Sequence, residues 1–211
     1  MSVTLRTEIL PTDLTAMMRW LANPHVSDNL NEHEQITAQL YQIYDAQLPV
    51  LTPLFNQNGR FWMIDPSFER PVGFLRAVYG AENSVEMVIA IGDEALWGRG
   101  LGKKALQAAL KEIFLEMRKE SIWVHIKHGN TRSHNLFMNS GFSFVQERTH
   151  TTQYALTFDD YLHPHPKQSA AARAQSCNLS DGSHGFTLKN QNNDAKQRGE
   201  LGKYRPSSEF E

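Results

Sequence analysis

Three glycines spaced two residues apart form the stretch of the sequence with the clearest chemical potential. Gly98, Gly100 and Gly102 follow an apolar run and lead into a segment with helical periodicity. Glycines let backbone N–H groups approach an anion, and the first turn of a helix adds unpaired N–H donors and partial positive charge. The cations Arg99 and Lys103 lie in the same stretch. The pattern therefore predicts a site for a phosphate or a pyrophosphate.

Two common nucleotide-binding loops do not fit this stretch. A Walker loop requires a glycine where Trp97 stands, and a serine or threonine where Lys104 stands. A dinucleotide fingerprint requires a third glycine at the position of Lys103. A glycine turn that only packs the helix against the preceding strand is the alternative to anion binding.

Two histidines further along the chain have a spacing that disfavours a metal site. His125 and His128 are three residues apart in an apolar run, so on a strand they tend toward opposite faces. The sequence contains no His-Glu-x-x-His or Cys-x-x-Cys pattern. We therefore expect no metal ion.

Apolar periodicity places these residues on alternating strands and helices. Strands are predicted at 3–9, 60–65, 72–79, 85–91, 122–126, 142–147 and 151–157. Helices are predicted from residue 12 or 13 to 21, and at 34–46, 100–118 and 132–139. Strands precede, separate and follow the helices, which predicts a mixed α/β (α+β) domain on one sheet.

The composition is that of an ordinary globular domain followed by a polar tail. The chain has 211 residues, 40% of them hydrophobic, and a formal net charge of −2, which disfavours nucleic-acid binding. A single cysteine excludes an internal disulfide, and no apolar run is long enough to cross a membrane. We expect a cytoplasmic protein with a folded domain at 1–162 and a disordered segment at 163–211.

Three motifs in order resemble the GNAT family of acetyl-CoA-dependent N-acyltransferases. They are Trp97-Gly-Arg-Gly-Leu-Gly102, then Asn130-Thr-Arg-Ser133 continuing to Gly141-Phe142, and the early Trp20-Leu-Ala-Asn-Pro24-His-Val26. The resemblance runs from about residue 3 to 158. Within the family, these motifs are most similar to the branch of ribosomal-protein N-terminal acetyltransferases and aminoglycoside 6′-acetyltransferases.

The resemblance implies a binding site for acetyl-CoA. It implies a mixed sheet of six to seven strands with about four flanking helices, splayed between the fourth and fifth strands, where the pantetheine arm enters. The implied contacts are backbone groups of the fourth strand, the glycine loop with its neighbours, and two residues after the fifth strand. These residues are Val88, Ile89, Ile91, Trp97, Gly98, Arg99, Gly100, Leu101, Gly102, Lys103, Asn130 and Phe137.

The resemblance also implies catalytic roles for a carboxylate and a hydroxyl group. Glu86 is the only carboxylate in the run 85–91 and would deprotonate the acceptor amine. His125, His128 or water are alternative bases, and Glu86 could instead only pair with Arg76. Many family members have a tyrosine as general acid, but Phe137 occupies that position, which leaves Ser133, water or a loss of activity.

The remaining alternatives concern the acceptor and the assembly. The acceptor could be a protein N-terminus, a polyamine, an aminoglycoside or another small amine, and segment 26–58 is expected to form its pocket. The protein would be a monomer or a homodimer. A non-catalytic CoA-binding module on the same fold is the alternative to an enzyme.

Overall fold

The computed structural model describes residues 3–31, 33–66 and 70–164. The chain divides into two units, Met1–Pro166 and Lys167–Glu211, and all described residues belong to the first. The predicted segment 163–211 lies outside the described residues from position 165 onward. The proposed boundary between domain and tail therefore stays a prediction.

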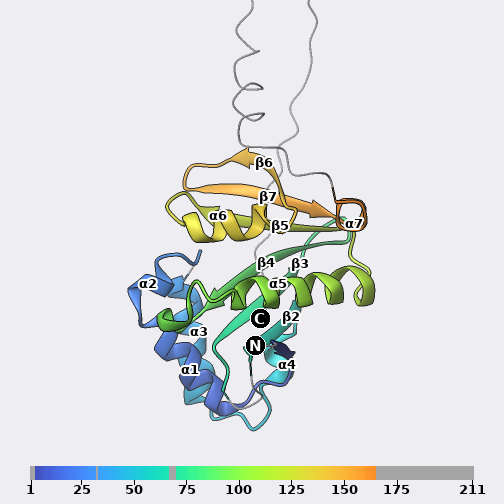
Figure 1. The fold of residues 1–211 in the computed structure, drawn as a ribbon. Helices are drawn as coiled ribbons and strands as arrows, with labels where there is room; N and C mark the ends of the chain where they lie inside the picture. The colour runs from blue at the N-terminus through green and yellow to red at the C-terminus, as the bar shows by residue number, and fades with distance from the viewer. Residues whose placement is uncertain (1–2, 32, 67–69, 165–211) are drawn as a thin grey trace, which may run out of the picture. The chain divides into compact units, whose positions relative to one another are not determined.

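Within the described residues, seven strands form one mixed sheet in the order β1-β2-β3-β4-β5-β7-β6 (Figure 1). The strands are β1 (Thr4–Arg6), β2 (Gly59–Asp65), β3 (Gly73–Tyr79), β4 (Ser84–Ile91), β5 (Ser121–Lys127), β6 (Ser143–Glu147) and β7 (Thr151–Thr157). All neighbouring strands are antiparallel except β4 and β5, which run parallel. The predicted fold class is confirmed.

The helices between these strands include the four that periodicity predicts. The α-helices among the described residues are α1 (Pro11–Leu21), α2 (Pro24–Ser27), α3 (His33–Asp45), α4 (Thr52–Phe55), α5 (Leu101–Lys111), α6 (Thr131–Met138) and α7 (Phe158–Leu162). The predicted helix 100–118 is helical from Leu101 to Glu116, but its last part, Glu112–Glu116, is a π-helix rather than an α-helix. A short 3₁₀ helix, Glu94–Leu96, precedes α5.

Buried apolar side chains cover both faces of the sheet, and β4 contributes to the clusters on each face. Val85 and Met87 are buried with Leu106 of α5 on one face. Ala90 is buried with Met17 of α1 and other apolar side chains of α1 and α3 on the opposite face. Successive side chains of a strand point to opposite faces, so β4 presents one set of side chains to α5 and the other to α1 and α3.

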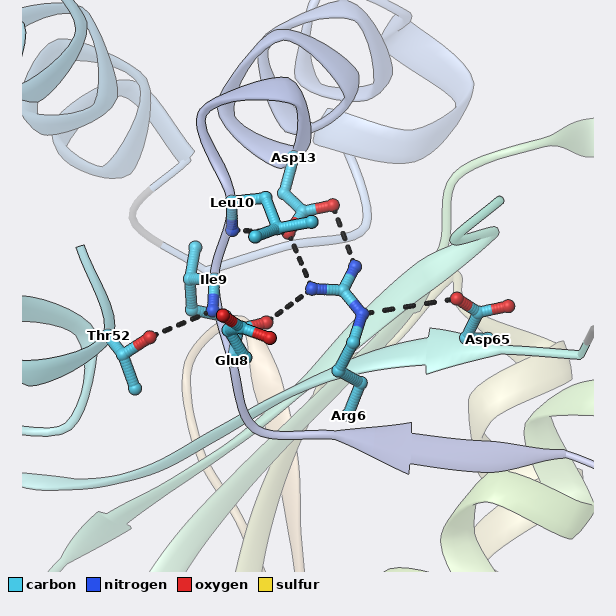
Figure 2. A network of polar contacts seen from close by, with 7 residues as sticks. All are labelled: Arg6, Glu8, Ile9, Leu10, Asp13, Thr52 and Asp65. Carbon is cyan, nitrogen blue, oxygen red and sulfur yellow. Dashed lines mark hydrogen bonds and ion pairs between the residues drawn. The ribbon is translucent and has the colours of Figure 1, made fainter. Parts of the chain in front are cut away.

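A buried ionic network ties β1 to the start of α1 (Figure 2). The Arg6 guanidinium donates two hydrogen bonds to the carboxylate of Asp13, at 2.9 and 3.0 Å, and its Nε lies 4.0 Å from an oxygen of Asp65. Asp13 also accepts the backbone N–H of Leu10 at 2.7 Å, which caps the helix. The hydrogen bond to Asp13 raises the pKa of the Arg6 guanidinium, against the opposing effect of burial.

The pairing between β4 and β5 ends long before either strand does. Their register contains three pairs, Ser84 with Ser121, Val85 with Ile122, and Glu86 with Trp123. Both strands are fully described, and β4 continues to Ile91 while β5 continues to Lys127 without further pairing. The two strands therefore diverge after Glu86, which confirms the predicted splay.

Candidate active site

The divergence leaves backbone groups of β4 directed toward the gap. Gly92 N–H donates to the carbonyl of Val72 at 2.8 Å, and antiparallel pairs alternate between bonded and non-bonded positions. Even-numbered residues of β4 therefore bond to β3. The N–H and C=O groups of Met87, Ile89 and Ile91 point to the other side, where β5 has separated.

This alternation changes the predicted backbone contacts at one position. Val88 is opposite Arg76 in the register, so its N–H and C=O groups are directed at β3 rather than at the gap. Met87, which sequence reasoning did not include, has its backbone groups in the favourable direction. Only the register of the antiparallel pair, which is not visible in a local sequence pattern, distinguishes the two residues.

Trp97, just before the glycines of the loop, is bonded to the end of β4 and contacts α6. Its indole Nε1–H donates to the carbonyl of Ile91 at 2.7 Å, so that carbonyl already has a partner. The guanidinium carbon of Arg132, in the first turn of α6, lies 3.6 Å from the centroid of the Trp97 ring. This cation–π contact joins the loop after β4 to the helix after β5.

The glycine loop turns into α5 with left-handed backbone at two positions. Gly98 has φ +74° and Gly100, the residue that begins the helix, has φ +76°, conformations that favour glycine. Because Gly100 has no side chain to accept a hydrogen bond, the first N–H groups of α5 are not capped by it. Arg99 and Lys103 are exposed on either side, whereas Leu101 is buried and can offer only its backbone.

Gly102 lies where three elements meet. A Cβ atom at this position would be 3.9 Å from Ile91 at the end of β4 and 3.7 Å from Leu136 of α6. Both distances are ordinary contacts, and Gly102 is helical with no positive φ. The residue thus marks the place where β4, α5 and α6 approach one another.

The predicted residues of α6 have clear structural partners. The Asn130 side-chain oxygen accepts the backbone N–H of Ser133 at 3.1 Å, so Asn130 caps the helix. Phe137 is 3% exposed and packs edge-to-face against Phe142, with ring centroids 5.0 Å apart. Contacts of Asn130 or Phe137 with CoA stay predictions, and both residues have a structural role without it.

Glu86 contacts a histidine rather than an arginine. Its Oε1 lies 2.8 Å from Nδ1 of His125, which stands on β5 two residues beyond the last registered pair. The side chain of Glu86 is 49% exposed and that of His125 is 19% exposed. Among the described ion pairs, none joins Glu86 to Arg76, the alternative partner. Glu86 and His125 therefore meet at the point where the strands diverge.

The other histidines of this region have different surroundings. His128 Nε2 lies 2.9 Å from Glu147 at the end of β6, and both side chains are largely exposed. His134 of α6 contacts the Tyr154 hydroxyl at 2.9 Å and the Lys127 carbonyl at 3.2 Å. Across residues 3–31, 33–66 and 70–164, no group of three or more His, Cys, Asp or Glu side chains could hold a metal ion.

The chemistry of these groups fits an acyl-CoA cosubstrate. Backbone donors and acceptors along diverging strands can bond the amides of a pantetheine arm, and an uncapped helix start with nearby cations can hold a pyrophosphate. Glu86 and His125 stand at the inner end of the same gap, where a thioester would lie. Acetyl-CoA, as the cosubstrate, supplies an activated acetyl group.

The comparisons with known proteins agree with this assignment. Residues 3–143 match the sequence profile of the acetyltransferase (GNAT) domain, so the chain belongs to the GNAT acetyltransferase family. It is an acetyl-CoA-dependent N-acyltransferase, which confirms the enzyme class and the cosubstrate implied by the three motifs. No curated protein sequence is similar enough to this chain to count as a match.

Several solved structures share the fold at low sequence identity. A domain from Methanocaldococcus jannaschii is similar over 74% of this chain and 98% of its own, with 22% identity and a TM-score of 0.58. The spermidine N-acetyltransferase of Vibrio cholerae, in complex with CoA and spermine, is similar over 76% of this chain and 98% of its own, with 16% identity and a TM-score of 0.59. An acetyltransferase from Thermus thermophilus is similar over 74% of this chain and 97% of its own, with 20% identity and a TM-score of 0.54.

The described helices are relevant to the prediction that the chain has no membrane-spanning segment. None of those helices is long enough and apolar enough to cross a lipid bilayer.

Proposed function

We propose that this enzyme transfers an acetyl group from acetyl-CoA directly to a primary amine, with both substrates bound at once. The observation that carries this proposal is the early end of the β4–β5 register at Glu86. It leaves a gap that has backbone amides along one side, the glycine loop at its outer end and an acidic side chain at its inner end.

The backbone of β4 and the loop after it would hold the cosubstrate. Met87 and Ile89 would bond the pantetheine arm, taking the role predicted for Val88, since their N–H and C=O groups face the gap. One of these N–H groups would also polarise the thioester carbonyl, as donors do in an oxyanion hole. The loop residues Trp97, Gly98, Arg99, Gly100, Leu101, Gly102 and Lys103 would surround the pyrophosphate, chiefly through backbone N–H groups.

Glu86 and Ser133 would assist the two proton transfers. Only the neutral form of an amine attacks a carbonyl, so a base must remove the proton of the acceptor ammonium. Glu86 provides negative charge for that step at the inner end of the gap. Ser133 lies in the first turn of α6 and would protonate the departing thiolate, with water as the alternative donor.

Polyamines are the first acceptors to test. A protein of similar fold acts on spermidine and was solved with spermine. In this chain the segment expected to form the acceptor pocket carries exposed acidic side chains, including Asp28 and Glu34, and the exposed aromatic side chains of Tyr41 and Tyr44. Acids and aromatic rings both attract a cationic amine.

Two measurements test this function together. Acetyl-CoA should raise the melting temperature, because binding only to the folded state stabilises it. Free CoA thiol should then appear on addition of spermidine or of at least one other primary amine in a panel that includes aminoglycosides and N-terminal peptides. Failure to bind acetyl-CoA, or binding without turnover of any amine, would refute the proposal. A Ser133→Ala protein that keeps full turnover would leave water as the proton donor.

A further inference from the structure

The side chains of Glu86 and His125, 39 positions apart in the sequence, are in hydrogen-bond contact. His125 Nδ1 and Glu86 Oε1 are 2.8 Å apart. An ionised carboxylate can only accept hydrogen bonds, so the contact requires a proton on Nδ1. In the neutral imidazole the other nitrogen, Nε2, then carries a free lone pair. Glu86 therefore selects the tautomer in which Nε2 is the basic atom.

Nε2 of His125 has no hydrogen-bond partner among the described residues, although it is buried. Leaving a buried polar atom unpaired costs about 1–3 kcal/mol, so protein interiors seldom contain one. His134 provides a comparison within the same protein, because both of its ring nitrogens have partners, Tyr154 and the Lys127 carbonyl. His134 is a satisfied structural histidine, and His125 has one position open to a donor.

His125 stands on β5 beside the gap, two residues beyond the last β4–β5 pair. Glu86, Trp123 and His125 lie on the face of the sheet opposite α5. Two contacts bring the connection between α2 and α3 to this point. Asn31 donates to the His125 carbonyl at 3.1 Å, and Lys127 Nζ donates to the Asp28 carbonyl at 2.9 Å. His125 therefore stands between the diverged part of β4 and the connection between α2 and α3.

We infer that His125 is the catalytic base of this enzyme and that Glu86 is a positioning residue that orients and charges the imidazole. The inference rests on the proposed function and divides its proton-transfer step between two side chains. The acceptor ammonium gives one proton to Nε2, directly or through one water molecule, and Glu86 stabilises the imidazolium that forms. The ring proton then leaves to solvent.

The bond changes that follow balance without any further reactant. The nitrogen lone pair forms the C–N bond to the thioester carbonyl carbon, and the C–S bond breaks with its electron pair remaining on sulfur. The nitrogen loses a second proton as the amide forms. The thiolate takes up one proton from Ser133 or water, and the second nitrogen proton replaces the one that this donor has given up. The products are an N-acetyl amine, CoA with a free thiol, and one proton.

A purely structural role is the rival explanation, because the hydrogen bond between Glu86 and His125 also joins β4 to β5 where they diverge. His125→Asn separates the two roles, since an asparagine amide can still donate to Glu86 but has no basic nitrogen. His163→Asn is the matched control. His163 also places Nδ1 near a carboxylate, Asp159 at 3.3 Å, but next to the exposed helix α7.

The expected result for His125→Asn is a fall in kcat on the order of 100-fold or more, the usual contribution of a general base. The KM for acetyl-CoA and the stabilisation by acetyl-CoA should stay as in the unsubstituted protein. Added imidazole should restore part of the turnover of His125→Ala. Glu86→Gln should lower kcat less than His125→Asn does, and His163→Asn should change nothing.

A spectroscopic measurement tests the tautomer without any acceptor. Long-range ¹H–¹⁵N correlation spectra of the full chain at neutral pH should show His125 with protonated Nδ1 and bare Nε2. In Glu86→Gln this preference should weaken or reverse. Protonated Nε2 in the unsubstituted protein would overturn the inference.

The kinetic outcomes separate this inference from the proposed function. If the unsubstituted protein turns over an amine and His125→Asn does so with full kcat, His125 is not the base and only the inference fails. Loss of turnover in His128→Asn but not in His125→Asn would transfer the role to His128 and also overturn it. If the unsubstituted protein turns over no amine, the proposed function fails and the inference fails with it.

Discussion

At the scale of single residues, the glycines of the loop have separate tasks. Gly100 needs its glycine for the backbone, because φ +76° is a conformation that other residues adopt only with strain. Gly102 has ordinary helical backbone, and a Cβ atom there would meet only ordinary contacts. The helix would accept a side chain at 102, so glycine there is best explained by the space an approaching anion needs.

Replacing Gly102 by alanine should therefore separate binding from stability. We expect Gly102→Ala to fold with unchanged or slightly higher stability, by up to about 1 kcal/mol, since alanine is the better helix former. Its Kd for CoA should rise about 10-fold or more, roughly 1.4 kcal/mol, because the methyl group stands beside the N–H groups of the first turn. Urea unfolding and calorimetric titration with CoA measure the two effects.

Gly100→Ala is the contrasting variant. There the left-handed backbone should lower stability by about 1–2 kcal/mol whether or not CoA is present. CoA affinity in Gly102→Ala equal to that of the unsubstituted protein would contradict the assignment of this loop to the pyrophosphate.

At the scale of elements, the network around Arg6 holds β1 and α1 in place. Asp13 is 1% exposed and serves both as the partner of Arg6 and as the cap of the Leu10 N–H. Without the Asp13 charge, Arg6 keeps the longer 4.0 Å contact with Asp65 but loses its two direct hydrogen bonds in a mostly buried place, which costs more than the loss of an exposed pair.

Asp13→Asn should accordingly destabilise the fold by about 3 kcal/mol, measured as a shift of the urea midpoint at constant slope. Arg60→Gln is the control, because the Arg60–Glu112 pair is 43% exposed on the arginine side and should contribute less than about 1 kcal/mol. Equal losses in the two variants would show that burial of the Arg6 pair does not matter.

Local patterns in the sequence predicted most elements but not how they end or meet. The strands are apolar runs rich in β-branched residues, and the long helices carry apolar residues at helical spacing, so both could be found. The first strand was predicted at 3–9 but ends at Arg6, since Ile9 N–H bonds to Thr52 rather than to a strand. The π-helical end of the predicted helix 100–118 depends on how its last residues pack.

In the candidate site, too, contiguous motifs could be predicted from the sequence, whereas contacts between distant segments could not. The glycine loop and Asn130 are contiguous motifs, so the sequence predicted them without tertiary information. The pairing of Glu86 with His125 depends on the register of two strands that are parallel and separated by a helix. Likewise, the Trp97–Arg132 contact joins two separate segments of the chain, and no spacing in the sequence indicates it.

At the scale of the whole molecule, α7 is the last described helix and belongs to the folded body. Phe158 and Tyr161 pack against Phe114, with ring centroids 5.9 and 5.0 Å away. We propose that the residues up to this helix carry the complete acetyltransferase unit, and that the boundary predicted near 162 marks its end.

Two shortened chains test that proposal. A chain ending at Pro164 should melt at the temperature of the full chain and bind acetyl-CoA with the same affinity. A chain ending at Thr157 should melt several degrees lower, because it loses two aromatic contacts of about 0.5–1.5 kcal/mol each together with their buried area. Thermal unfolding with and without acetyl-CoA measures both, and loss of binding in the longer of the two would place an essential part beyond Pro164.

The short register between β4 and β5 has a mechanical consequence. Three residue pairs make the seam between two half-sheets, one of β1 to β4 and the other of β5, β7 and β6. A cosubstrate lying along the unpaired part of β4 and β5 would contact both strands and so connect the two half-sheets for as long as it is bound. Its departure would remove this link along the open part of the seam, so acetyl-CoA would change the stiffness of the protein between β4 and β5 as well as occupy its site.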